Sequence, residues 1–316
     1  PDQILVTNGA QHGLDLILRL LLSPGERVLT ELPSYPGALD AIQAHGGRVL
    51  AIPFAEHGGW DVAAMASTLQ QSSPRLALLI PDFNNPTGTL IGSEQRSQVV
   101  AAARRAGTRV VADESFVELD LSTEDRSAEP PVPMAALSPD VFSVGSMSKP
   151  IWGGLRAGWI RTDAETVTRL AIVRARADMS GSVLDQLLAC ELFADYPQII
   201  ADRRAELRAG RDALLTALAE RLPGWRPSRP AGGLSSWIRL DAPASSALTH
   251  QAEQRGVLLT PGSRFTVEAS LERYLRIPFA LPPAVLSDAI GRIALAWAEL
   301  DGQPVRRFEA GLLVPT

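Results

Sequence analysis

The alternation of short apolar runs with amphipathic stretches in the first half of the chain most constrains its fold. Runs such as Ile4–Thr7, Arg27–Leu32 and Leu76–Ile80 have the length and composition of buried strands. Helices are expected between them, for example Gln11–Leu22, whose leucines and isoleucine recur with helical spacing. Strands that alternate with helices pair in parallel and carry helices on both faces. The first half is therefore predicted to be an α/β sheet, with Arg48–Pro53, Arg109–Ala112, Val141–Val144 and Ala157–Arg161 as further strands.

The second half predicts a different organisation. Helices are expected over Glu165–Ala177 and Leu184–Phe193, then a long arginine-rich helix over 197–222, and after it a smaller α+β section. Its expected elements are the strands Leu234–Leu240, Val257–Thr260 and Tyr274–Ile277 and the helices Ala244–Arg255 and Pro283–Leu300. We predict a large, mostly parallel α/β domain over residues 1–200 and a smaller C-terminal α+β domain over residues 201–316. The four prolines of Ser122–Pro139 predict a loop.

Composition excludes several classes of function. Hydrophobic residues make up 46 % of the 316 residues and the net charge is −5, with the arginines scattered, so this chain is not expected to bind nucleic acid itself. No apolar run is long enough to predict a membrane span. Cys190, the only cysteine, lies in an apolar run that predicts a buried helix face, and a cytoplasmic location is expected. The four histidines lack metal-ligand spacing, so no metal is expected. The start at Pro1, without an initiator methionine, indicates a fragment of a longer protein.

Lys149 is the only lysine among 30 basic residues. Arginine supplies positive charge but stays protonated, whereas a lysine amine can lose its proton and form a Schiff base. Chance could have left one lysine in an arginine-rich chain. However, Lys149 follows Gly145-Ser146-Met147-Ser148 directly after an apolar run, which indicates a catalytic amine at a strand end.

Further motifs are expected at strand ends, where an open parallel sheet binds its ligand. Asn8-Gly9-Ala10-Gln11 precedes a helix, whose first N–H groups could approach a phosphate, although such turns are common. Tyr35 could stack on a planar ligand or be an ordinary turn residue. Asn85, in Asn85-Pro86-Thr87-Gly88, could donate to a ring oxygen, and a plain Asn-Pro turn is the weaker alternative.

Charged groups follow the next two strands. Asp113 ends an apolar strand, and a buried carboxylate requires a partner, for which a protonated pyridine nitrogen would be suitable; the alternative is a helix cap. Ser146, Ser148 and Arg156, in Gly154-Leu155-Arg156-Ala157-Gly158-Trp159, suit a phosphate dianion.

In this order the motifs resemble the fold-type-I pyridoxal-phosphate enzymes of the class I/II aminotransferase type, from Ile4 to about Leu300. The resemblance implies pyridoxal 5′-phosphate as cofactor, Lys149 as the Schiff-base lysine, Asp113 as the partner of the pyridine nitrogen, and an amino acid or other small amine as ligand. It also implies a homodimer. The remaining implied contacts are Asn85 at the ring hydroxyl, Tyr35 over the ring, and a phosphate cup of Gly9, Ala10, Gln11, Ser146, Ser148 and Arg156. Arg276 matches the arginine that binds a substrate carboxylate, the alternative being a surface arginine on an edge strand.

Two local stretches of the sequence resemble one branch of this family more closely, the MocR-type regulators of the GntR superfamily. Gly145–Trp159 and Pro261-Gly262-Ser263-Arg264-Phe265 carry this resemblance. It implies the effector-sensing domain of a transcriptional regulator, with DNA bound only through a winged helix absent from this chain. A working aminotransferase is the alternative, and decarboxylase or lyase chemistry is a third option.

Phe116 departs from the family pattern, in which a tyrosine three residues after the aspartate donates to the ring hydroxyl. Loss of that donor leaves the ring oxygen more basic and its shared proton more tightly held. We therefore predict a raised pKa for the Schiff base on Lys149 and slow first-step exchange with amines.

Overall fold

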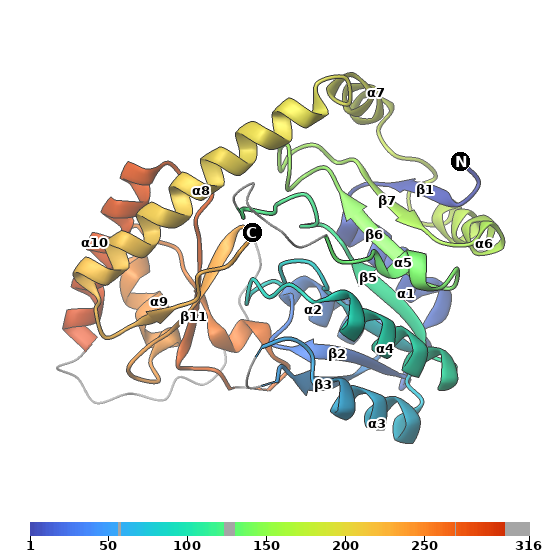
Figure 1. Cartoon of the computed structure of the whole chain (residues 1–316), viewed down its shortest axis with the longest axis horizontal. Helices are drawn as coiled ribbons and strands as arrows, with labels where there is room; N and C mark the ends of the chain where they lie inside the picture. The colour runs from blue at the N-terminus through green and yellow to red at the C-terminus, as the bar shows by residue number, and fades with distance from the viewer. Residues whose placement is uncertain (56–57, 123–129, 269, 301–316) are drawn as a thin grey trace.

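The computed structural model describes residues 1–55, 58–122, 130–268 and 270–300 and shows a large α/β part beside a smaller α+β part (Figure 1). The large part is built on a seven-stranded sheet with the order β1-β7-β6-β5-β4-β2-β3. Its strands are β1 (Ile4–Thr7), β2 (Arg27–Leu32), β3 (Arg48–Pro53), β4 (Leu76–Leu79), β5 (Arg109–Asp113), β6 (Phe142–Ser146) and β7 (Gly158–Arg161).

The sheet is parallel in its middle and antiparallel at one side. Strands β3, β2, β4, β5 and β6 pair in parallel, as predicted. Strand β7 pairs antiparallel with both β6 and β1. For β6 and β7 the reason is that no crossover helix separates them, and a parallel connection needs one. The sheet is therefore mostly, not wholly, parallel, which confirms the predicted fold class.

Two hydrophobic cores lie on opposite faces of this sheet. Helices α1 (Ala10–Leu21), α2 (Pro36–Ala44) and α6 (Ala164–Ala175) cover one face, and α3 (Val62–Ser72), α4 (Ser93–Arg105) and α5 (Met134–Leu137) cover the other. Strand residues alternate between the cores: Val111 packs into the first, and its neighbours Val110 and Ala112 into the second. Helix coverage on both faces agrees with the prediction from alternating strands and helices.

The smaller part combines a four-stranded antiparallel sheet with three helices. The sheet order is β10-β11-β9-β8, with β8 (Arg226–Pro227), β9 (Ser235–Arg239), β10 (Thr260–Pro261) and β11 (Tyr274–Pro278). Helices α8 (Tyr196–Arg221), α9 (Ser245–Glu253) and α10 (Pro283–Leu300) pack with it in one core. Helix α8 runs from α7 (Val183–Leu192) to the small sheet (Figure 1), so the predicted domain boundary near residue 200 falls inside a continuous helix.

Three sequence predictions differ from the structure. Within the expected strand Val257–Thr260 only Thr260 pairs with β11, and Val257 instead packs on the small core. The expected loop Ser122–Pro139 contains the short helix α5, and its residues 123–129 lie outside the described residues. Cys190 is exposed on α7 rather than buried, since the leucines around it also face outward.

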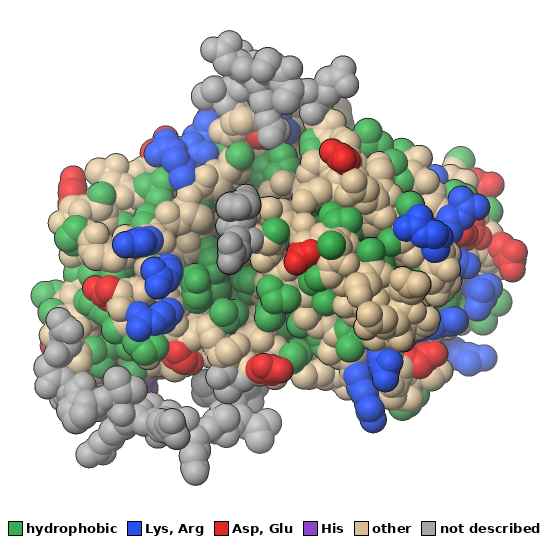
Figure 2. Space-filling view, turned by 60° about the horizontal axis from the view of Figure 1, so that its bottom comes forward, with side chains coloured by type: hydrophobic (Ala, Val, Ile, Leu, Met, Phe, Trp, Pro, Cys, Tyr) green, Lys and Arg blue, Asp and Glu red, His purple; other side chains and the backbone are tan. Residues whose placement is uncertain are grey.

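Surface charge is mixed. Figure 2 shows basic and acidic side chains interspersed over one face of the molecule. Within the described ranges, no helix is both long and apolar enough to cross a bilayer, and no group of three or more His, Cys, Asp or Glu side chains could hold a metal ion.

Candidate functional site

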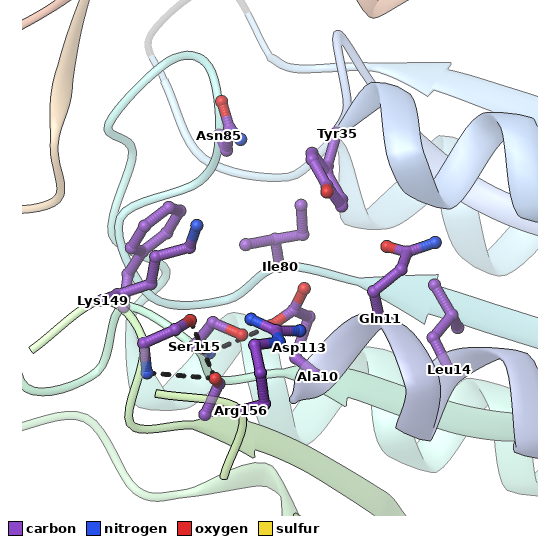
Figure 3. A pocket seen from close by; sticks show the side chains of 13 residues that line it. Ala10, Gln11, Leu14, Tyr35, Ile80, Asn85, Asp113, Ser115, Lys149 and Arg156 are labelled. Atoms are coloured by element: carbon purple, nitrogen blue, oxygen red, sulfur yellow. Dashed lines mark hydrogen bonds between the residues drawn. The ribbon is translucent and has the colours of Figure 1, made fainter. Parts of the chain in front are cut away.

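A pocket lies where the predicted motifs converge at the carboxyl ends of the parallel strands. Figure 3 shows Tyr35, Asn85 and Lys149 around one cavity, with Asp113, Arg156 and the start of α1 beside them. Nine of the predicted site residues line it: Ala10, Gln11, Tyr35, Asn85, Asp113, Ser146, Ser148, Lys149 and Arg156. Segments far apart in the sequence therefore meet at one site.

The turn between β1 and α1 has a backbone that favours glycine. Gly9 has φ 86° and ψ 171°, a conformation that side chains rarely adopt, and α1 begins at the next residue. The Asn8 carbonyl accepts a hydrogen bond from Arg156 Nη2 at 2.8 Å. A β-carbon on Gly9 would lie 2.4 Å from that same nitrogen. The absence of a side chain at Gly9 thus lets Arg156 lie against the turn, next to the first free N–H groups of the helix.

Two serines complete this corner of the pocket. Ser146 Oγ donates to Ser148 Oγ at 2.9 Å and accepts from the Ser148 N–H at 3.1 Å. Strand β7 lies against the turn, because a β-carbon on Gly158 would meet the Gly9 backbone at 2.6 Å. Hydroxyls, helix N–H groups and a guanidinium therefore gather at one end of the cavity, which is the donor set that a phosphate dianion prefers.

Asp113 and Lys149 give the pocket its electrostatic character. Burial raises the pKa of Asp113, and a hydrogen bond from the Ser115 N–H at 3.0 Å opposes this shift. The pKa of Lys149 is lowered because surrounding protein removes its amine from bulk water, and Arg276 and Arg156 lower it further, against the attraction of Asp113. A lysine with a lowered pKa is a better nucleophile and base near neutral pH.

Asn85 stands on a tightly bonded loop. The bond from Asn85 to Pro86 is cis, and Asn85 is buried with its Oδ1 atom unbonded within the described residues. The neighbouring Asn84 donates to Glu31 Oε1 at 3.0 Å. On the loop's other side, buried Arg96 forms an ion pair with Asp82 at 2.7 Å. These contacts hold the Asn85 amide at the cavity.

The side chains of Gln11 and Arg276 form contacts within the chain that the sequence did not predict. Gln11 Nε2 donates to the Gly37 carbonyl at 2.8 Å, so its amide holds the start of α2 beside Tyr35. Arg276, on β11, is outside the pocket wall, and its Nε donates to Ser235 Oγ at 3.1 Å. Its charge still reaches the site, where it lowers the pKa of Lys149 and opposes the effect of burial, which raises the pKa of Tyr35.

Sequence reasoning missed several residues at the pocket. Leu14, Ile80 and Ser115 line it. Ser115 could have been found, because a serine two residues after an aspartate at a strand end is a common turn partner. The sequence predicts only that Leu14 and Ile80 are core residues, because the spacing of apolar residues does not distinguish a position in a pocket wall from one in the hydrophobic core.

The chain matches the family model of aminotransferase class I and II over residues 1–293. It is 32 % identical to 2-aminoadipate transaminase of Thermus thermophilus, over 89 % of this chain and 71 % of that protein. It is 30 % identical to the HTH-type transcriptional regulator YisV of Bacillus subtilis, over 83 % of this chain and 54 % of the regulator.

Among solved structures, LysN, an α-aminoadipate aminotransferase of Thermus thermophilus complexed with N-(5′-phosphopyridoxyl)-L-leucine, superposes with a TM-score of 0.87 at 31 % identity. The superposition covers 95 % of this chain and 78 % of LysN.

Proposed function

We propose a function from the premise that this chain belongs to the aminotransferase class I and II family, whose members depend on pyridoxal 5′-phosphate. The chain binds this cofactor with Lys149 as its covalent anchor and recognises an amino acid or related amine through the carboxylate. One observation carries the proposal: the only lysine and Asp113 line one pocket, and the charge of Arg276 reaches it.

The donor set of the pocket fits the cofactor. Gly9, Ala10, Ser146, Ser148 and Arg156 would hold the phosphate, with Gln11 bracing the same corner. A carboxylate whose pKa is raised by burial gains from a nearby cation, and a protonated ring nitrogen would supply one to Asp113. Asn85 would donate to the ring hydroxyl and Tyr35 would cover the ring face.

The chain's residues would then divide the chemistry among them. When bound, pyridoxal phosphate supplies an aldehyde that condenses with amines and a protonated ring that withdraws electrons. Arg276 binds the α-carboxylate of the ligand and so fixes its orientation. Lys149 Nζ would accept the α-proton of the ligand and return it. Asp113 keeps the ring nitrogen protonated, and Phe116 and Ile80 keep that part of the pocket apolar.

As to biological role, we propose the effector-sensing part of a MocR/GntR-type transcriptional regulator. Support comes from the similarity to YisV and from the sequence around Lys149, which resembles that of such regulators. The chain spans about half of that regulator, so DNA binding would belong to a separate part of the protein. Phe116 favours this role, because slow exchange suits a ligand that stays bound.

A second candidate is a working aminotransferase that moves an amino group from an amino acid to a 2-oxo acid. The likeness to 2-aminoadipate transaminase and to LysN favours it. The pocket supports it as well, since Lys149 and Asp113 line the pocket and the charge of Arg276 acts on Lys149.

Visible spectra of the chain with pyridoxal phosphate, before and after addition of an amino-acid panel, test both roles. A cofactor band that is absent in Lys149→Ala is expected in either case. Conversion to the amine form of the cofactor by one amino acid identifies an aminotransferase. A band that shifts with ligand and then persists identifies a sensor. Failure of the wild-type chain to bind the cofactor would refute the proposal.

We further propose a homodimer located in the cytoplasm. Large apolar side chains are exposed on α7, with Leu184 at 79 % and Leu187 at 58 % exposure, and Trp152 is 61 % exposed. A second copy of the chain would cover them. Sedimentation at micromolar concentration should give twice the chain mass, and a monomer at that concentration would contradict this proposal.

A further inference from the structure

A cluster of polar side chains that are not part of the pocket lining holds the Asn8 turn. His12, on the first turn of α1, accepts a hydrogen bond from the Asn8 N–H through Nδ1 at 3.0 Å. The Asn8 side chain donates to Asp178 Oδ2 at 2.7 Å. Arg174, which is buried on α6, donates to Asp178 Oδ1 at 2.9 Å and also to the Val6 carbonyl. The turn is thus held at its N–H, its side chain and the strand before it.

Asn8 joins this cluster to the pocket. Its carbonyl accepts from Arg156 Nη2, so one residue is bonded by His12 on one side and by the predicted phosphate-binding arginine on the other. We infer that His12 is a positioning residue, whose neutral imidazole fixes the turn that binds the cofactor phosphate. This inference rests on the proposed assignment of that turn to the phosphate.

The bond to Asn8 requires a particular protonation state. An N–H donor needs an unprotonated Nδ1, and in the doubly protonated imidazole Nδ1 is itself a donor. Acid would therefore place two donors against each other and leave the Asn8 N–H without its acceptor. The consequence is a cofactor site that weakens as His12 becomes protonated.

The surroundings of His12 favour the neutral ring. The charged groups acting on it are Asp15 and Arg19 on its own helix, Arg174 on α6, and Asp178 just after α6. Burial lowers the pKa of His12, Asp178 opposes this, and Arg174 lowers it further. Because the folded-state pKa lies below the ordinary 6.5, the neutral form contributes its stabilisation above pH 6.5 and loses it as the pH falls through the folded-state value.

The test measures binding of 4′-deoxypyridoxine 5′-phosphate, an analogue without the aldehyde, by calorimetry at pH 8 and pH 5. His12→Asn keeps an acceptor near the Nδ1 position and does not titrate, whereas His12→Leu removes the acceptor. The phosphate and the pyridine ring of the analogue also titrate, but they do so equally for every variant and therefore do not affect the comparison between variants. His45→Asn is the matched control, because His45 bonds Asp15 rather than the turn.

We expect the wild-type chain and His45→Asn to lose more affinity than His12→Asn on acidification, by an additional factor of about 2 to 12, the effect of one hydrogen bond. His12→Leu should bind more weakly by a similar factor already at pH 8. Parallel pH curves for wild type and His12→Asn would overturn the inference and leave the proposed function intact. Failure of the wild type to bind the analogue at pH 8 would overturn both.

A nitrogen-detected NMR spectrum of wild-type His12 gives a second reading that does not depend on any variant folding. At pH 8 the ring proton should reside on Nε2. A proton on Nδ1 would contradict the hydrogen bond from Asn8 and with it the inference.

Discussion

Replacement of Gly9 by alanine, compared with a control variant, should distinguish an effect on cofactor affinity from an effect on folding stability. Gly9 has φ 86°, so alanine costs about 1–3 kcal/mol of backbone strain at this position. Its new β-carbon would lie 2.4 Å from Arg156 Nη2, which is the flexible end of a side chain. Arg156 is therefore expected to swing away, and the collision itself adds little further loss of stability.

The displaced arginine loses its bond to the Asn8 carbonyl and its place at the phosphate corner. A hydrogen bond involving a charged group contributes about 1.5–3 kcal/mol, which corresponds to a loss of roughly 10- to 150-fold in cofactor affinity. Titration of the chain with pyridoxal phosphate, followed by visible absorbance, measures this loss directly.

Gly25→Ala is the matched control. Gly25 has the same φ of 86°, but among the described residues, its two chain neighbours apart, no atom lies within 4 Å of a β-carbon placed there. Both variants should lose comparable unfolding free energy in urea, and only Gly9→Ala should lose cofactor affinity. Equal cofactor affinity in the two variants would refute the role given to Gly9 and Arg156.

Three other substitutions test separate parts of the site. Burial raises the pKa of Glu31 to about 8, so wild-type stability should fall as the pH rises from 4.5 to 8, and urea melts of Glu31→Gln should show a flatter profile. Phe116→Tyr should lower the pKa of the Schiff base on Lys149 and speed amine exchange; a wild-type Schiff base already deprotonated at neutral pH would contradict this. Arg276→Leu should lower the affinity for an amino acid by roughly 10- to 150-fold. The affinity for the matching amine, which has no carboxylate, should stay unchanged, and spectral titration measures both.

The fold could be predicted because local patterns and global architecture agree in this chain. Periodicity placed the strands of the large sheet within two residues of their observed bounds. The direction of β7 could not be predicted from periodicity, since an isolated strand pattern carries no information about its partner. The exposure of Cys190 was missed for a related reason: an apolar helix face looks the same whether it packs within the chain or faces outward.

The residues around the pocket were predictable where chemistry restricts the residue type. A lone lysine, a strand-ending aspartate and a glycine turn have few structural reasons to coincide. Glu31 and His12 escaped prediction because their importance depends on tertiary contacts, with Ile80 and Asn84 for Glu31 and with Asn8 and Asp178 for His12. Only the folded chain brings these groups together.

The position of β1 has a consequence for the order in which the molecule is assembled. In the described sheet β1 lies at the edge and pairs only with β7. During synthesis the first strand therefore has no partner until Gly158–Arg161 has left the ribosome, and pairing over such a sequence separation is slow. The turn after β1 can reach its final shape only then, so the nascent chain acquires affinity for the cofactor late, after the parallel centre of the sheet is able to form.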